Sequence, residues 1–282
     1  MKKYFAVFAF AAFACAFAGG EEFSLEKRLD EEIAKNAGKD FAEKLPEGER
    51  LFYSQSSKSA FIIFSKDLAA RNFGFALAGK AELAAEEMFG EVAAFQNPIE
   101  IHFLDEGEAK FEGNFLETSP FGPDIVLSVK YSKNLPLDEF FERLSRIYLR
   151  AYSLKCGAGA NPPYWIELAL RAMIAKQIAD FAPIELARVL KQNPPDKILD
   201  VLKYSRESAG NIEKMEASAY FSLLAMRSAF GGNSQAWFDT LRHFLTSGAV
   251  GEDFMRARFG EGCGDKLWVG VYGEFYARLS GV

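Results

Sequence analysis

Apolar and polar residues follow one period in the front of this chain and another behind Leu137. In the front part, short apolar or alternating runs indicate the strands of a small sheet. These runs lie at 61–64, 99–104, 110–116 and 124–131. Between the first two runs, apolar residues recur at helical spacing from Phe73 to Met88, and Gly90 follows as a stop. The pattern predicts about four strands and a helix that covers one face of their sheet.

In the rear part, apolar residues recur with a period of 3.6, and no later run is typical of a strand. One apolar stripe follows 137–154, opposite a charged side. A second helix, from Trp165 to about Phe181, lacks a polar side, which predicts a central position. Prolines precede this helix and two shorter ones, at Pro162-Pro163, Pro183 and Pro194-Pro195. Four final helices are expected, with N-caps at Asn211, Ser234 and Asp265 and stops at Gly231, Gly248 and Gly260.

These elements predict an α+β fold, with a small, mostly antiparallel sheet and helices in the N-terminal half and an all-helical C-terminal half. The 282 residues, 49% of them hydrophobic, can bury one large core or two modest ones. Length therefore does not fix the number of domains. We expect four segments: a signal peptide at 1–18, a polar leader at 19–50, an α+β region at 51–182 and a helical region at 183–282.

The first residues are typical of a cleavable export signal. Residues 1–3 are Met-Lys-Lys, residues 4–17 are unbroken apolar sequence, and Ala-Phe-Ala at 16–18 predicts cleavage before Gly19. The apolar run is shorter than the roughly 20 residues of a membrane-spanning helix, so no stable membrane insertion is expected after cleavage. A lipid anchor at Cys15 is the alternative, but the residues before it lack the usual aliphatic side chain. The sequence predicts export to the periplasm or the cell exterior.

Charge and cysteine usage narrow the choice of partners. The 33 Lys and Arg and 39 Asp and Glu give a net charge of −6, and cleavage removes two lysines, which leaves −8. Because no basic field exists to attract a phosphate backbone, nucleic acid is not an expected partner. The mature chain keeps Cys156 and Cys263, each in a Gly-rich loop. An oxidising compartment would allow a disulfide between them, and two unpaired buried thiols are the alternative.

Standard catalytic signatures are missing from the sequence. A zinc hydrolase commonly needs two histidines one helical turn apart, but His102 lies in an expected strand and His243 in a late helix. No Gly-x-Ser-x-Gly elbow, phosphate-binding glycine loop or EF-hand pattern occurs. We therefore expect no cofactor and no metal, and the balance of these observations is against an enzyme.

The order of elements nevertheless resembles the gluzincin, or peptidase-MA-like, metallopeptidases. The resemblance spans 61–178: a sheet-bearing part, then Leu-Ser-Arg-Ile-Tyr-Leu-Arg at 144–150, a loop, and Asn-Pro-Pro-Tyr-Trp-Ile-Glu-Leu-Ala at 161–169. In that family the first helix carries His-Glu-x-x-His, and Pro-x-Trp-Leu-x-Glu-Gly opens the second. Pro163 and Trp165 match this second motif. The resemblance implies a peptidase-like scaffold over 51–182.

All four functional positions depart from the family pattern. By this alignment Arg146 and Arg150 stand where the metal-binding histidines would be, and Ile147 replaces the catalytic acid. Leu168 falls at the place of the third zinc ligand. The resemblance therefore implies the scaffold without the zinc or the hydrolysis.

The same residues also have simpler interpretations. Arg146 and Arg150 would form a solvated helix face, with Glu142 paired to Arg146; alternatively, the two guanidiniums would grip a carboxylate or phosphate in a former active-site cleft. Glu167 would pair with Arg171 along its own helix.

Trp165, beside Pro163, is expected to anchor the second helix in the core or to border that cleft.

The leading hypothesis is a non-catalytic, exported protein that binds a polypeptide. The bound segment would add to the edge of the sheet beside the helix at 137–154, a mode that needs backbone pairing but no catalyst. One alternative is an envelope structural or assembly protein that acts through its helical half. Another is a hydrolase with an unrecognised site.

Overall fold

The computed structural model describes residues 52–54, 60–90, 95, 98–119, 124–132, 134–158, 161–178, 182–208, 210–247 and 252–280. The expected signal peptide, Cys15 and the polar leader lie outside these residues. Within the described ranges, no helix is both long and apolar enough to cross a membrane.

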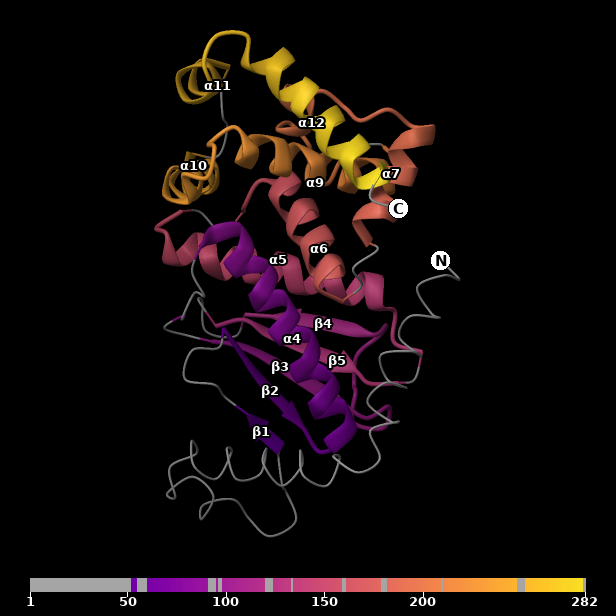
Figure 1. The fold of residues 1–282 in the computed structure, drawn as a ribbon. Helices are drawn as coiled ribbons and strands as arrows, with labels where there is room; N and C mark the ends of the chain where they lie inside the picture. The colour runs from indigo at the N-terminus through magenta and orange to yellow at the C-terminus, as the bar shows by residue number, and fades with distance from the viewer. Residues whose placement is uncertain are drawn as a thin grey trace, which may run out of the picture.

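The front of the molecule is built on a five-stranded sheet (Figure 1). Its strands are β1 (Phe52–Ser54), β2 (Phe61–Ser65), β3 (Ile99–Leu104), β4 (Phe115–Thr118) and β5 (Val126–Lys130), in the spatial order β1-β2-β3-β5-β4. The two central pairs, β2 with β3 and β3 with β5, are parallel, and the two outer pairs are antiparallel. The α+β class thus agrees with the structure, but the prediction of a mostly antiparallel sheet is wrong because the sheet is mixed.

Helix α4 (Leu68–Phe89) explains the parallel centre. It carries the chain from the end of β2 back to the beginning of β3, and a crossover of this kind makes the two strands parallel. Afterwards the chain passes to the outer edge as β4 and returns as β5 between β3 and β4. Hydrophobic spacing locates strands, but it does not state the order in which they pair.

Both ends of α4 have clear local causes. The Asp67 carboxylate accepts a hydrogen bond from the Ala70 N–H at 2.9 Å, which caps the first turn. The helix ends at Gly90, where φ is +78°. A Cβ at this position would lie 2.1 Å from the ring of Phe238, so only glycine fits both the left-handed backbone and the close packing.

One face of the sheet packs on α4 and on α5 (Leu137–Lys155), and an aromatic layer joins the sheet to α5. We define the aromatic layer as Phe61, Phe103, Phe115, Phe140 and Tyr148, none of them more than 8% exposed. The Phe140 ring of α5 stacks on Phe115 at 5.8 Å and lies 6.0 Å from Phe103. Tyr148, two turns later, lies 6.0 Å from Phe61. This layer fixes α5 across the sheet.

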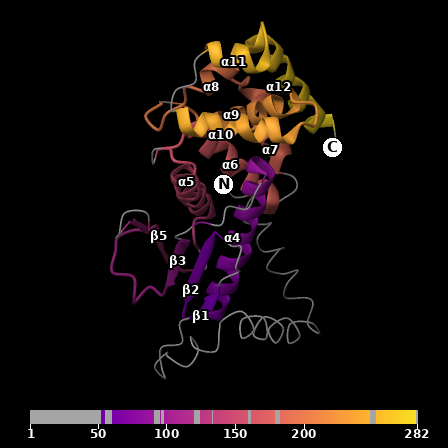
Figure 2. The ribbon, with the colours of Figure 1, turned by 90° about the vertical axis from the view of Figure 1, so that its left-hand side faces the viewer.

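The rear of the molecule is helical, as predicted, and lies at one end of the sheet (Figures 1 and 2). Its elements are α6 (Tyr164–Ile178), α7 (Ala182–Gln192), α8 (Ile198–Val201), α9 (Ile212–Ser228), α10 (Ser234–Ser247), α11 (Glu252–Phe259) and α12 (Cys263–Ser280). Helix α6 packs against α4, α5 and α9, which confirms its predicted central position. It ends at Ile178 rather than near Phe181, and α7 begins at Ala182.

The N-cap predictions have mixed outcomes. The Asn211 side chain caps α9 by accepting from the Glu213 and Lys214 N–H groups, as expected. Ser234 is the first residue of α10, and its neighbour Asn233 provides the cap by accepting from Ala236 N–H at 3.1 Å. Asp265 lies within the first turn of α12 and does not cap it.

One continuous hydrophobic cluster joins the two halves. It includes residues of the sheet, of α4 and α5, and of every later helix. The disulfide that the sequence allowed is not formed: Cys156 at the end of α5 and Cys263 at the beginning of α12 are free thiols. Cys263 is buried in the core among the rear helices, as the first residue of α12 rather than in the Gly-rich loop that was expected.

Candidate functional site

The structure does not bring the four degenerate motif positions together. Ile147 and Leu168 are buried in the core, 0% and 2% exposed. Arg146 instead extends into a group of charged residues beside the sheet. Arg150 lies one turn further along α5, and its Nε is buried without a hydrogen-bond partner in the described part of the chain. The aligned positions thus divide between the hydrophobic core and the partly exposed side of α5.

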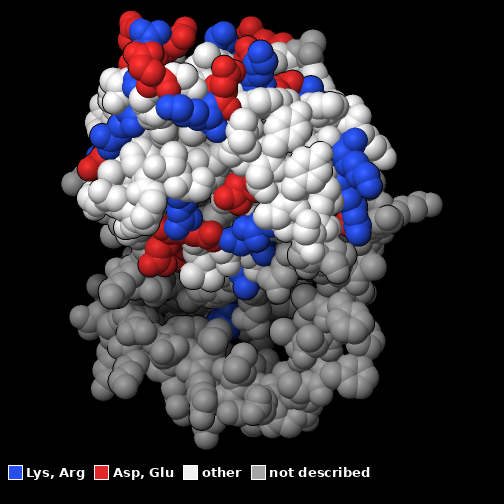
Figure 3. Space-filling view, turned by 45° about the horizontal axis from the view of Figure 1, so that its top comes forward, with Lys and Arg blue, Asp and Glu red and all other residues white. Residues whose placement is uncertain are grey.

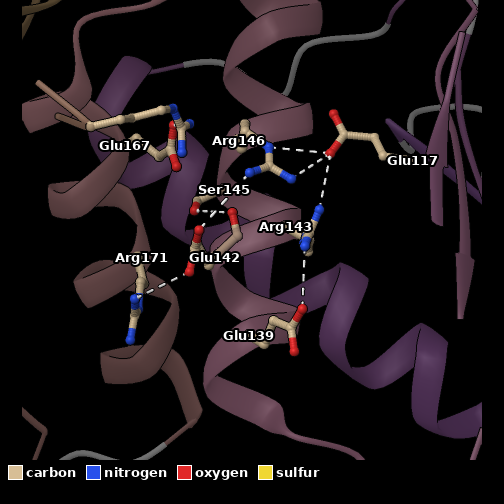
Figure 4. Close-up of polar contacts among 9 residues, drawn as sticks. Glu117, Glu139, Glu142, Arg143, Ser145, Arg146, Glu167 and Arg171 are labelled. Atoms are coloured by element: carbon tan, nitrogen blue, oxygen red, sulfur yellow. Dashed lines mark hydrogen bonds and ion pairs between the residues drawn. The ribbon is translucent and has the colours of Figure 1, made fainter. Parts of the chain in front are cut away.

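Charged side chains gather along α5, between β4 on one side and α6 on the other (Figure 4). We call this group the charged seam; its members are Glu117, Glu139, Glu142, Arg143, Arg146, Glu167, Arg171, Arg206 and Glu216. They come from β4, α5, α6, α9 and the irregular segment between α8 and α9. The seam therefore joins the front of the molecule to the rear.

Glu117 of β4 is the partner of Arg146. Its Oε2 accepts from Arg146 Nη2 at 2.5 Å and from Nε at 3.2 Å, and Arg143 Nη1 lies 3.9 Å away. The Glu117 and Arg146 side chains are 17% and 23% exposed. The predicted i,i+4 pair of Arg146 with Glu142 is present but looser, at 3.9 Å. Arg146 is therefore held mainly by a residue 29 positions earlier in the chain, which local spacing could not identify.

Glu167 pairs with Arg206 rather than with Arg171. Arg206 Nη2 donates to Glu167 Oε2, and its guanidinium lies over the ring of Tyr164 at 5.1 Å. Arg171 instead contacts Glu142 at 3.9 Å and Glu216 at 3.5 Å. The expected pairing along α6 is thus replaced by contacts between different elements.

The two acids most deeply placed in the seam are Glu167 and Glu216, with side chains 3% and 12% exposed. Burial raises the pKa of each carboxyl to about 7, although Arg206 opposes the shift at Glu167 and Arg171 opposes it at Glu216. The second oxygen of Glu167, Oε1, is buried without a hydrogen-bond partner in the described residues. Both acids therefore titrate near neutrality.

The residues at the aligned positions do not fit zinc. Guanidiniums carry no lone pair for a metal, and leucine and isoleucine offer no donor atom. The two histidines lie apart from the seam: His102 bonds Glu100 at 2.8 Å on the sheet, and His243 stacks on Phe254. Across the described ranges, no three His, Cys, Asp or Glu side chains are grouped to hold an ion. No metal-dependent step can be assigned to these residues.

The residues expected to border a former cleft belong to the core. Tyr148 is 0% exposed and lies in the aromatic layer. Trp165 is 1% exposed and meets Phe244 of α10 edge-on at 5.3 Å. Trp165 therefore has the anchoring position in the core, and both side chains expected at the border of a cleft are buried. Pro163, just before α6, is partly buried.

Family models, curated proteins and solved structures all give no match when compared with this chain. The resemblance to the gluzincins therefore stays a prediction based on motif order.

Proposed function

We propose that this protein is exported and binds an extended polypeptide, without catalysis, by adding it as a further strand to β4. The main-chain groups of β4 that point away from β5 carry this proposal. In the described part of the chain, β4 pairs only with β5, so its other side is the edge of the sheet. An edge strand offers a row of N–H and C=O groups to an incoming segment.

The direction of these groups follows from the register. The Lys130 N–H donates to the Asn114 carbonyl at 2.8 Å, which makes this pair a hydrogen-bonded one. Because antiparallel pairs alternate, Leu116 and Thr118 also bond toward β5, while the main chain of Phe115 and Glu117 points outward. Among the described residues, two N–H and two C=O groups of β4 therefore point to this edge without a partner in the sheet.

The side chains beside this edge support binding rather than hydrolysis. Glu117 lies between the edge and Arg146, so an added strand would lie next to the charged seam. Arg146 and Arg150 replace the imidazoles that a zinc peptidase needs, and a guanidinium stays protonated at physiological pH, so it cannot act as a base. The peptide's charged side chains would find complementary partners there.

The proposal is tested by comparing Glu117→Pro with Glu117→Ala. Both variants lose the carboxylate, but only proline loses the outward N–H, a change that edge strands tolerate. A pool of synthetic heptapeptides is screened against the mature protein, and the tightest binder is titrated. We expect Glu117→Pro to bind it at least about tenfold more weakly than Glu117→Ala, the loss of one hydrogen bond in an ordered interface.

A second measurement covers the case in which Glu117→Pro does not fold. Hydrogen exchange at the Phe115 and Glu117 amides of the unchanged protein should slow when the peptide is added. Equal binding by both variants, unchanged exchange at these two amides, or no peptide bound at millimolar concentration would each contradict the proposal.

Helix α12 favours a second candidate function, assembly with another protein through the helical half. Val269 and Tyr276 are 70% and 58% exposed on this helix. On the same helix, the rings of Trp268 and Tyr272 contact each other edge-on, with centroids 5.0 Å apart. Figure 3, which looks onto the helical half, shows a broad uncharged area bordered by charged side chains. Crosslinking in the native host tests this candidate: a partner crosslinked to the unchanged protein but not to Val269→Asp/Tyr276→Asp would support it.

A further inference from the structure

Glu167 has one satisfied and one unsatisfied oxygen. Its Oε2 accepts from Arg206, and Oε1 is buried with no hydrogen-bond partner among the described residues. A buried acceptor without a donor costs about 1–3 kcal/mol, more when it is charged. The carboxylate is therefore placed to accept a second donor.

Arg206 bonds only one of the two oxygens of Glu167. It belongs to the irregular segment between α8 and α9, and its side chain is 45% exposed although that of Glu167 is 3% exposed. Its guanidinium covers the Tyr164 ring but donates to a single oxygen of the carboxylate. A guanidinium and a carboxylate pair best through two parallel hydrogen bonds. The pair in the structure falls short of this geometry by one bond.

We propose that Glu167 and Tyr164 form a guanidinium-binding subsite, which Arg206 occupies in the free protein and an arginine side chain of the bound polypeptide takes over by displacing it. This inference rests on the proposed binding of a polypeptide at β4. The incoming arginine would donate to both oxygens of Glu167 and stack on Tyr164 as Arg206 does.

The neighbouring charges agree with a cationic ligand. Glu142 of α5 and Glu167 of α6 both help to raise the pKa of Tyr164, and Glu142 also helps to raise the pKa of Glu167, so both acids act on the same place. Arg146, a second cation that acts on Glu167, is already held by Glu117 at 2.5 Å. Displacing Arg206 would leave an acidic position lined by an aromatic ring. Arginine is favoured over lysine there because only its planar fork reaches both oxygens.

The test uses the tightest heptapeptide from the pool, with arginine, lysine or citrulline placed at each position in turn. Citrulline keeps the shape of arginine without its charge. We expect the best arginine peptide to bind the mature protein at least about tenfold more tightly than its citrulline counterpart, one good charge-assisted contact. In Arg206→Ala, which lacks the internal competitor, this preference should increase further.

Two matched glutamine variants locate the effect. Glu167→Gln should abolish the preference for arginine. Glu216→Gln, which changes a second buried acid paired with an arginine in the same seam, should keep it. Because burial raises the pKa of Glu167 to about 7, the preference should also weaken as pH falls from about 8 to about 6.

The outcomes separate the two proposals. If arginine and citrulline peptides bind equally tightly to the unchanged protein and to Arg206→Ala, the subsite is refuted and strand addition stands. If no peptide binds any variant, strand addition is refuted, and the subsite is then judged with agmatine alone. Agmatine should raise the melting temperature of Arg206→Ala more than that of Arg206→Ala/Glu167→Gln; equal effects would refute the subsite as well.

Discussion

The two sides of α5 differ in their surroundings: one side is apolar and buried, and the other is charged and partly exposed. On one side, Phe140, Ile147 and Tyr148 are at most 1% exposed, and the rings of Phe140 and Tyr148 contact aromatic rings of the sheet. On the other side, Arg143 and Arg146 keep 29% and 23% of their side chains exposed and bond acids of the seam. The apolar side needs only neighbours that exclude water. The charged side needs partners at defined positions and angles.

This difference decides how each side contributes to stability. Burying an aromatic side chain removes a large apolar area from water, and its loss leaves a cavity. Partly exposed ion pairs contribute little, commonly about 0–1 kcal/mol, because water already solvates the separate charges. The aromatic layer therefore holds α5 in place, while the ion pairs of the seam add little to the stability of the fold.

The largest expected effect is on the aromatic side. Phe140→Ala removes a ring that contacts Phe115 and Phe103, so we expect the free energy of unfolding to fall by about 3–5 kcal/mol. Urea titration monitored by circular dichroism measures this change.

Glu139→Ala, on the charged side of the same helix, is the control. Its side chain is 41% exposed and bonds Arg143 at 3.2 Å, so the loss should stay under about 1 kcal/mol. Equal losses for the two variants would mean that the sides of α5 do not differ as described.

The next largest effect is a pH dependence of the unfolding free energy, caused by a buried acid of the seam. The carboxyl of Glu216 has a folded-state pKa of about 7 against an ordinary value of 4.5, so between these values the folded protein holds a proton that the unfolded chain has released. Stability due to this group is thus present below about pH 4.5, falls as pH rises toward 7 and is constant above. The unfolding free energy of the unchanged protein, relative to Glu216→Gln, should decrease by up to about 3 kcal/mol across this window.

Phe140→Ala provides the contrasting background. It leaves Glu216 and Arg171 in place, so its unfolding free energy should follow the same pH dependence as that of the unchanged protein, at a lower level. If the difference in unfolding free energy between the unchanged protein and Glu216→Gln does not vary with pH, the buried Glu216 carboxyl does not cause the pH dependence of stability.

The aromatic side was predictable from the sequence because its information is local. Phe140, Leu144, Ile147 and Ala151 recur at helical spacing, and the structure buries all four. The Ile99, Ile101 and Phe103 face of β3 follows in the same way from alternation. Periodicity states which residues are buried and leaves open what they pack against.

The charged side was predictable only where both partners lie on one helix. Glu142 with Arg146 satisfies the i,i+4 rule, but it is the weaker contact of Arg146. Glu117 comes from an edge strand that the looser alternation placed at 110–116 rather than at 115–118. Arg206 comes from a segment with no regular structure. Their meeting depends on the strand order and on the position of α6, which no local pattern contains.

The N-caps of α9 and α10 are local signals, because each capping side chain bonds an N–H two or three residues later, and they have the smallest expected effect on stability. Asn211 caps α9 as predicted, whereas Asn233, not the predicted Ser234, caps α10. Asn211→Ala and Asn233→Ala should each lower the unfolding free energy by about 1 kcal/mol, measured in urea, because each leaves a helix N–H without its acceptor. Ser234→Ala should change it by less than about 0.5 kcal/mol, since its main chain already begins the helix. A larger loss for Ser234→Ala than for Asn233→Ala would contradict the cap seen in the structure. It would mean that the sequence alone had identified the N-cap of α10 correctly.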